Sequence, residues 1–277
     1  MNADIKPRTQ DTYVTVDGLR LRLLEEGTGP AVLLLHGASL GSSADVFRRN
    51  LGPLAKAGFR AIAFDMPGCG RSDVPTDHSL AYRSRMVPKL MDALGLPRAA
   101  LIGHSQAGAV AVELALNDPA RITHVVVLGT GSLLPPLPGS DGRPERAAPA
   151  AEPSLAETRA ALEATLYHRD LATPAEVELR HGVCIGRNFA AAVARAAVVE
   201  APPAKSAPPL WQRLTELKSP LLMIYGRQDR AQAAERAMLL KQKFPQLDLH
   251  LIDDCKHLVP WDAADEFVRL TGRFLER

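Results

Sequence analysis

One serine stands where an apolar run meets an alanine-rich helical pattern, and it could act as a nucleophile there. Residues 100–108 read ALIGHSQAG, with Ser105 flanked by Gly103 and Ala107. Small residues at these positions allow a strand to turn sharply into a helix, and such a turn lifts the serine hydroxyl above a sheet. The usual pattern is G-x-S-x-G, and alanine replaces its last glycine here. Ser105 is therefore a candidate nucleophile, with helix capping as the alternative role.

A serine at its ordinary pKa needs a base, and that base needs an acid to orient it. Asp229 and His257 each follow a predicted strand, and the chain order serine, acid, histidine is one that triads use. Alone, Asp229 would be read as a helix cap and His257 as a surface loop residue, but together they predict a catalytic triad. Asp253 and Asp254 are rival acids, which we interpret as turn formers because they stand so close before His257.

Acyl transfer also needs hydrogen-bond donors aimed at the developing oxyanion. His36, Gly37 and Ala38 follow the apolar run 31–35, at the carboxyl end of another predicted strand. The expected donors are the backbone N–H groups of Ala38 and Gln106. His36 is either a second catalytic histidine or a structural residue of the loop that it forms with Gly37, and we favour the structural role.

Short apolar runs alternate with helical patterns along most of the chain, which predicts a mainly parallel sheet with helical crossovers. The first two runs, 13–16 and 19–24, flank the hairpin dipeptide Asp17-Gly18, so the sheet should begin with an antiparallel ribbon. Further strands are predicted at 31–35, 60–64, 99–102, 123–128, 221–225 and 248–252. Helices are predicted at 45–57, 79–94, 106–117, 154–167, 174–183, 187–199, 231–243 and 262–276.

Two proline clusters interrupt the alternation. Residues 134–153 carry six prolines, and a second cluster consists of Pro202, Pro203, Pro208 and Pro209. Because proline-rich chain cannot propagate a helix or a central strand, we read the first cluster as a flexible excursion and both as hinges of a helical insertion. The predicted domains are a core from 1–130, a helical cap from 131–212 and the remaining core from 213–277.

Charge and cysteine content exclude several classes of protein. The chain has 33 basic and 31 acidic residues without a long basic run, so nucleic acid is not expected as a partner. Cys69, Cys184 and Cys255 lie too far apart for a C-x-x-C pair, which favours a reducing compartment. No H-E-x-x-H or comparable ligand set occurs in the sequence, so we expect no metal and no cofactor. Residues 1–6 lack a signal-peptide core, and no window approaches 18 apolar residues. We expect a cytoplasmic protein that acts on a small molecule away from membranes, and the sequence leaves a homo-oligomer open.

With these motifs in place, the chain resembles an α/β-hydrolase over nearly its whole length. The resemblance rests on the His36-Gly37 loop, residues 65–73 (DMPGCGRSD), the Ser105 turn, the insertion after the sixth core strand, residues 226–229 (GRQD) and His257. It implies an α/β fold with a mainly parallel eight-stranded sheet, flanking helices and a helical cap inserted after strand 6.

Within that superfamily the chain is similar to the meta-cleavage product hydrolases, which cut a carbon–carbon bond in dienol diketo acids during aromatic degradation. The similarity rests on residues 47–54 (FRRNLGPL), 173–180 (TPAEVELR) and 261–267 (WDAADEF). In that branch a cap arginine binds the substrate carboxylate, and Arg180 occupies the matching place, with a solvated helix residue as the alternative. His104 and Leu258 stand where the branch usually has asparagine and tryptophan, and we expect both to contact the substrate.

The leading hypothesis is therefore a cofactor-free serine hydrolase that cleaves a carbon–carbon bond in dienol diketo acids. In it His257, oriented by Asp229, takes the proton of Ser105. A carboxylesterase or lactonase using the same residues is the alternative, and a non-catalytic ligand-binding protein of this fold is a remote one. Dehalogenases and epoxide hydrolases are disfavoured, since the resemblance implies an aspartate in place of Ser105.

Overall fold

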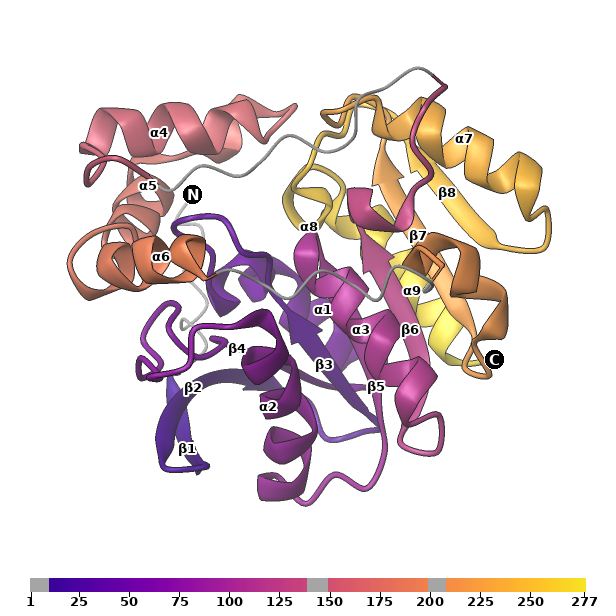
Figure 1. Cartoon of the computed structure of the whole chain (residues 1–277), viewed down its shortest axis with the longest axis horizontal. Coiled ribbons are helices and arrows are strands. Elements are labelled where there is room, and N and C mark those ends of the chain that lie inside the picture. Colours follow the sequence, from indigo (N-terminus) through magenta and orange to yellow (C-terminus); the bar gives the residue numbers. More distant parts are fainter. Residues whose placement is uncertain (1–9, 139–148, 199–207) are drawn as a thin grey trace, which may run out of the picture.

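The computed structural model describes residues 10–138, 149–198 and 208–277, and these form an eight-stranded sheet with helices on both faces (Figure 1). The strands are β1 (Thr12–Val16), β2 (Leu19–Glu26), β3 (Ala31–Leu35), β4 (Arg60–Phe64), β5 (Ala99–His104), β6 (Ile122–Leu128), β7 (Leu221–Gly226) and β8 (Asp248–Ile252). Their order in the sheet is β1-β2-β4-β3-β5-β6-β7-β8. β2 pairs antiparallel with β1 and with β4, and the remaining pairs are parallel. All eight predicted strands, the opening ribbon and the parallel body of the sheet are confirmed.

The helices also follow the prediction, with two differences. They are α1 (Arg48–Lys56), α2 (Leu80–Ala93), α3 (Gln106–Asn117), α4 (Leu155–Ala164), α5 (Pro174–His181), α6 (Arg187–Ala197), α7 (Ala233–Lys243), α8 (Val259–Asp262) and α9 (Ala264–Leu275). Short 3₁₀ turns are η1 (Ala44–Phe47), η2 (Gly131–Leu133), η3 (Arg169–Leu171) and η4 (Leu210–Glu216). The predicted helix 45–57 is divided into η1 and α1. The predicted helix 262–276 starts earlier and is interrupted at Ala263, whose backbone is not helical.

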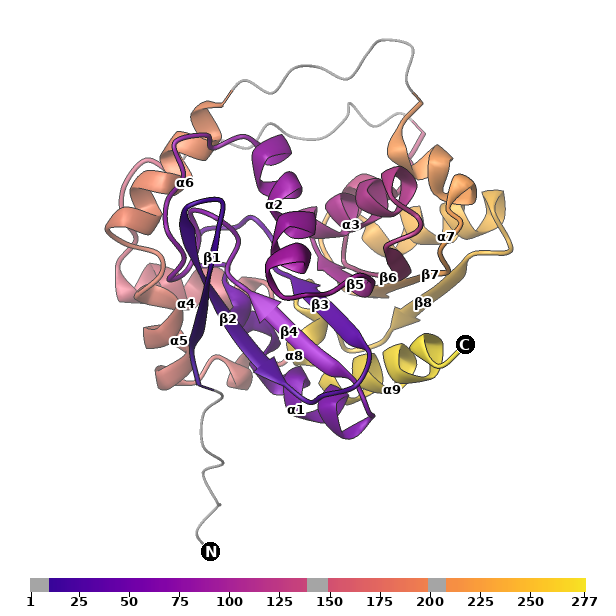
Figure 2. The same cartoon turned by 90° about the horizontal axis from the view of Figure 1, so that it is seen from below.

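Helices cover both faces of the sheet, as Figure 2 shows from below, and a hydrophobic layer lies between the sheet and the helices on each face. Along β3, Leu33 and Leu35 point into the layer formed with α2, α3 and α7, whereas Val32 and Leu34 point into the layer formed with α1, α8 and α9. Because side chains alternate along a strand, a strand buried on both faces must be apolar at every position. This explains why the parallel strands are legible as continuous apolar runs.

The helices α4, α5 and α6 lie together beside the sheet (Figure 1), and Leu162 of α4 and Val177 of α5 belong to the same hydrophobic layer as α1, α8 and α9. Leu133, Leu134 and Leu214, which fall inside the predicted cap range, are buried in the core with α3. The ends of that range therefore pack with the core, and the division into domains stays a prediction. Much of both predicted proline-rich hinges, at 139–148 and 199–207, lies outside the described residues.

No helix in the part of the chain that the structure describes is long and apolar enough to cross a membrane. Within the same residues no group of three or more His, Cys, Asp or Glu side chains is arranged to hold a metal ion. Cys69, Cys184 and Cys255 are free and buried.

Candidate active site

Ser105 occupies the turn between β5 and α3 in a strained backbone conformation. Its φ of 56° and ψ of −126° lie where residues with a side chain rarely fall, at a typical cost of about 1–3 kcal/mol. A Cβ on Gly103 would lie 2.4 Å from the carbonyl oxygen of Ala107, and one on Gly108 would lie 2.0 Å from Thr130 Oγ1. The small residues in the sequence pattern are thus required by the close approach of the strand, the helix and the turn.

Ser105, His257 and Asp229 form one chain of hydrogen bonds. His257 Nε2 lies 3.1 Å from Ser105 Oγ, and His257 Nδ1 lies 3.1 Å from each carboxylate oxygen of Asp229. The three residues follow β5, β8 and β7, whose carboxyl ends meet at the same edge of the sheet. The Asp229 side chain is only 3% exposed, so little water competes for its bond to the imidazole.

The two rival aspartates are turned toward other partners. Asp253 pairs with the guanidinium of Arg227, and Asp254 is in hydrogen-bonding contact with the hydroxyl of Tyr167. Asp254 has a φ of 52°, which is the turn geometry expected of it. Among these three aspartates, Asp229 is the one that the fold brings to His257.

His36 lies under the loop that follows β3 and bonds only to backbone. Its Nε2 accepts the backbone N–H of Met66 at 3.0 Å, and its Nδ1 lies 2.7 Å from the carbonyl oxygen of Gly37, so Nδ1 carries the proton. Burial lowers the pKa of His36, which keeps the ring neutral. This bonding favours the structural interpretation of His36, because both nitrogens are already occupied.

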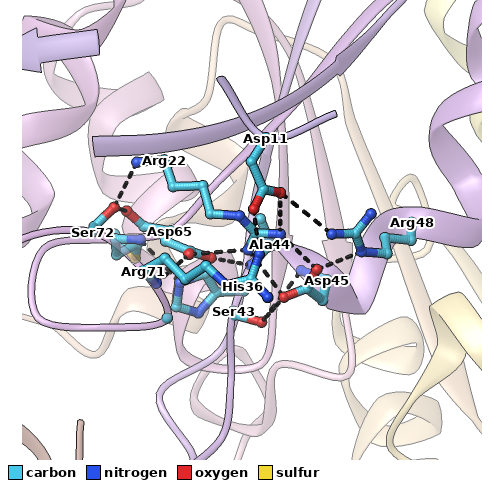
Figure 3. Close-up of polar contacts among 12 residues, drawn as sticks. Asp11, Arg22, His36, Ser43, Ala44, Asp45, Arg48, Asp65, Arg71 and Ser72 are labelled. Atoms are coloured by element: carbon cyan, nitrogen blue, oxygen red, sulfur yellow. Dashed lines mark hydrogen bonds and ion pairs between the residues drawn. The ribbon is translucent and has the colours of Figure 1, made fainter. Parts of the chain in front are cut away.

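A buried ionic network holds the same loop in place (Figure 3). Arg22 of β2 donates two hydrogen bonds to Asp45, of 3.0 and 2.8 Å, and a third to Asp65 at 3.1 Å. Asp65 in turn accepts the backbone N–H of Ala44 at 2.6 Å and that of Arg71 at 2.7 Å. The network ties the loops after β3 and β4 together, and the first of these loops carries Gly37 and Ala38.

The oxyanion donors proposed from the sequence lie beside the serine turn. A Cβ on Gly37 would lie 3.1 Å from Ser105 Cβ, so glycine lets the loop run directly against the serine. Gln106 is the first residue of α3, where backbone N–H groups lack helical acceptors. Gln106 and Gly37 thus flank Ser105 from the helix and from the loop, and Ala38 is the next residue of that loop.

A cavity that is partly open to solvent lies against His257 of the proposed triad. The three side chains expected to bind substrate, Arg180, His104 and Leu258, all line it. The rest of its lining is Gly37, Ser39, Ser42, Val46, Thr165 and His257. The fold therefore brings a cap arginine, the residue before the serine and the residue after the histidine to one place.

Arg180 reaches from α5, in the predicted cap, onto the loop that follows β3. Its Nη2 donates to the carbonyl oxygen of Leu40 at 3.3 Å, and its side chain packs over Gly41, where a Cβ would lie 3.0 Å from Arg180 Cγ. No carboxylate pairs with Arg180 among the described residues, and burial lowers the pKa of its guanidinium. A half-buried cation without a carboxylate partner can accept an anionic ligand.

His104 supports the loop that carries the catalytic histidine. Its Nε2 donates to the carbonyl oxygen of His257 at 2.9 Å, and the two rings lie with centroids 4.9 Å apart. Burial, followed by the neighbouring His257, lowers the pKa of His104 to about 3. His104 therefore stays neutral at any pH near 7 while it lines the cavity.

The sequence reasoning missed three residues of this site. Thr130 Oγ1 donates to the carbonyl oxygen of Ser105 at 2.6 Å, Asp262 accepts the backbone N–H of Lys256 at 2.9 Å, and Arg230 Nη2 lies 3.1 Å from His257 Nε2. A cation directly after the candidate acid is the one signal for Arg230 in the sequence. Nothing local marks Thr130 or Asp262, since their partners lie on other elements.

The family model and the sequence relatives that match this chain are all described as hydrolases. Residues 30–264 match the family model described as the alpha/beta hydrolase fold. The chain is 33% identical to a 2-hydroxy-6-oxononadienedioate/2-hydroxy-6-oxononatrienedioate hydrolase of Burkholderia vietnamiensis, over 96% of this chain and 95% of the relative. It is 32% identical to the 2-hydroxy-6-oxo-6-phenylhexa-2,4-dienoate hydrolase of Burkholderia cepacia, over 98% of both chains.

A solved structure agrees with these sequence relatives. The meta-cleavage product hydrolase from Pseudomonas fluorescens IP01 superposes with a TM-score of 0.77 over 96% of this chain and 97% of its own, at 24% identity. At that identity the likeness concerns the fold alone, and the sequence relatives carry the family assignment. The chain belongs to the α/β-hydrolase fold family, in the branch of the 2-hydroxy-6-oxo-dienoate hydrolases.

Proposed function

We propose that the protein is a cofactor-free serine hydrolase that cleaves the C5–C6 bond of a 2-hydroxy-6-oxo-dienoate with water. The observation that supports the proposal is that His257 and Arg180 line the same cavity. His257 belongs to the hydrogen-bonded chain Ser105–His257–Asp229, and Arg180 has no carboxylate partner among the described residues. The triad can perform acyl transfer, and the cation can hold the carboxylate of an acidic substrate. The named substrates of the two Burkholderia relatives are acids of this kind.

The reaction begins with ketonisation, in which the proton of the C2 enol hydroxyl leaves and a proton is added at C5. The substrate is then a C2,C6-diketone with a C3–C4 double bond. This form is required because a C5 carbanion is now conjugated through that double bond with the C2 carbonyl. The guanidinium of Arg180, which would hold the adjacent carboxylate, lies near the place where this charge is delocalised.

Cleavage then follows the ordinary course of acyl transfer. Ser105 Oγ attacks the C6 carbonyl, its proton passes to His257 Nε2, and the oxyanion is held by the backbone N–H groups of Ala38 and Gln106. The C5–C6 bond breaks and leaves a dienolate that takes the proton back from His257. Protonation at the C2 oxygen gives a 2-hydroxypentadienoate, and protonation at C5 gives its keto form. Water, activated by His257, hydrolyses the remaining acyl-serine to a carboxylic acid.

A carboxylesterase or lactonase is the second candidate. His104 and Leu258 line the cavity at the two positions where the branch usually has asparagine and tryptophan, so the surface offered to the substrate differs. The triad and the oxyanion donors would act in the same way on an ester.

The cytoplasmic location and the formation of a homo-oligomer stay predictions.

The test is a parallel turnover screen of the purified protein with a 2-hydroxy-6-oxo-dienoate, p-nitrophenyl esters and lactones. We expect the dienoate to give a 2-hydroxypentadienoate and a carboxylic acid in equal amounts by NMR, with the highest kcat/KM. Turnover of esters or lactones without the dienoate would move the assignment to the second candidate. An absence of both turnover and fluorophosphonate labelling would point to a ligand-binding protein.

A further inference from the structure

Arg230, the residue directly after Asp229, directs its guanidinium at the proposed catalytic base. Its Nη2 lies 3.1 Å from His257 Nε2, and the same Nε2 lies 3.1 Å from Ser105 Oγ. Arg230 and Ser105 therefore both contact the same nitrogen atom of His257. That atom is the one that must receive the serine proton.

Arg230 and Ser105 compete as hydrogen-bond donors to His257 Nε2. An arginine guanidinium only donates hydrogen bonds, so His257 Nε2 must be the acceptor and Nδ1 must carry the proton that is directed at Asp229. In that tautomer Nε2 has one lone pair. Arg230 and the Ser105 hydroxyl therefore share a single acceptor in the free protein.

The backbone after Arg230 is strained. Ala231 and Gln232 have φ values of 56° and 53°, which are uncommon for residues with a side chain, before α7 begins at Ala233. The Arg230 backbone N–H also donates to Asp229 Oδ1 at 2.7 Å. Two successive left-handed residues and this bond set the direction of the chain at Arg230, and strain of this kind is found at functional sites.

No carboxylate forms an ion pair with Arg230 among the residues that the structure describes, and the residue is exposed. Arg227 of the same loop differs, because its guanidinium pairs with Asp253. The charge of Arg230 reaches the cavity, since it is one of the groups that, after burial and His257, lower the pKa of His104. Arg230 is thus an exposed cation, without an ion-pair partner among the described residues, next to the proposed reacting atoms.

Proton transfer to His257 Nε2 is disfavoured while Arg230 stays in place. Once His257 Nε2 has taken the Ser105 proton, an imidazolium N–H would face a guanidinium N–H, which sets two donors and two positive charges against each other. The guanidinium has to move away, and an anionic oxygen of the substrate would give it a new acceptor. A neutral substrate offers no such acceptor.

We propose that Arg230 is a specificity-determining residue that occupies His257 Nε2 in the free protein and is drawn away by an anionic group of an acidic substrate. The inference rests on the Ser105–His257 pair of the proposed function, but it does not depend on carbon–carbon cleavage. It separates the tasks of two cations, because Arg180 binds the substrate from the cap whereas Arg230 couples the substrate charge to release of the base.

The experiment compares two esters with the same p-nitrophenyl leaving group, anionic mono-p-nitrophenyl adipate and its neutral methyl ester. The variants are Arg230→Ala, Arg230→Lys, which keeps the cation, and Arg227→Ala as the matched control from the same loop. In Arg230→Ala we expect kcat/KM for the neutral ester to rise and the acid-to-neutral ratio of kcat/KM to fall by about tenfold or more, the size of one lost charged hydrogen bond. Arg230→Lys should retain most of the ratio, and Arg227→Ala all of it.

An unchanged ratio in Arg230→Ala, whether both rates fall together or neither changes, would overturn the proposal, as would an equal fall of the ratio in Arg227→Ala. If neither ester is hydrolysed, the same ratio is taken from the rates at which a neutral and a carboxylated fluorophosphonate label Ser105. A dienoate assayed beside the esters keeps the two hypotheses apart. Failure on the dienoate with a charge ratio that depends on Arg230 rejects the proposed substrate and retains the role of Arg230.

Discussion

The backbone N–H of Leu258 donates to the carbonyl oxygen of Thr165 at 3.2 Å, so the residue after the proposed base is bonded directly to the cap. Asp262 strengthens the same connection. Its carboxylate accepts the backbone N–H groups of Tyr167 and His168 from the cap and that of Lys256 from the loop of His257, at distances of 2.9 to 3.1 Å. The position of the cap and the position of the base are therefore coupled.

Asp262→Ala should lower both stability and kcat. The change removes a charged acceptor of three backbone N–H groups, and loss of hydrogen bonds to a charged group typically costs about 1.5–3 kcal/mol. Urea unfolding measures the first effect and steady-state kinetics the second. Asp265→Ala, an exposed neighbour, is the control and should change neither. Normal kcat in Asp262→Ala would show that the cap and the His257 loop are set independently.

Ser105→Ala and His257→Ala should each lower kcat by several orders of magnitude and leave the circular dichroism spectrum unchanged, because triad residues act as a unit. Asp229→Asn should also be severely impaired, since it no longer favours the Nδ1–H tautomer of His257. Asp253→Asn, whose carboxylate faces Arg227, is the control. Retained activity in purified Ser105→Ala would falsify the nucleophile assignment.

In His104→Asn the free energy of unfolding should depend less on pH between pH 7 and 4 than in the wild type. The pKa of His104 is about 3 in the folded chain and about 6.5 in an unfolded one, so between these values only the unfolded chain binds the proton. The free energy of unfolding therefore decreases as the pH is lowered from 6.5 to 3, by up to about 1.4 kcal/mol per pH unit. Above pH 6.5 the contribution of His104 to stability does not change with pH. Urea unfolding at pH 7, 6, 5 and 4 measures it.

The expected result is a difference in unfolding free energy that moves in favour of His104→Asn as the pH falls. A constant offset between the two proteins is acceptable, because asparagine makes other contacts. Curves that stay parallel from pH 7 to pH 4 would contradict the low pKa of His104.

Arg180→Ala should reduce kcat/KM for a dienoate by roughly 10- to 150-fold, from a lost charged hydrogen bond of about 1.5–3 kcal/mol. A neutral aryl ester should be affected much less, because it presents no carboxylate. Arg169→Ala, an exposed cap residue, serves as the control. Equal losses on both substrates would mean that Arg180 supports the cap and does not bind the substrate.

The strands and the turn at Ser105 can be predicted from the sequence because they depend on residues that are close together in the chain. Strands buried on both faces must be apolar at each position, and the turn at Ser105 needs Gly103 and Gly108 within a few residues. These short-range requirements predict the eight strands and the order in which Ser105, Asp229 and His257 follow their strands.

The tertiary structure decided which distant side chains meet. Asp253 stands four positions before His257 and Asp229 stands 28 positions before it, yet the path of the loop after β7 brings Asp229 and not Asp253 to His257 Nδ1. Arg180 reaches Leu40 across 140 positions, and Arg230 reaches His257 across 27. Such contacts depend on how whole elements pack and on backbone strain such as that at Ala231, and neither leaves a periodic pattern in the chain.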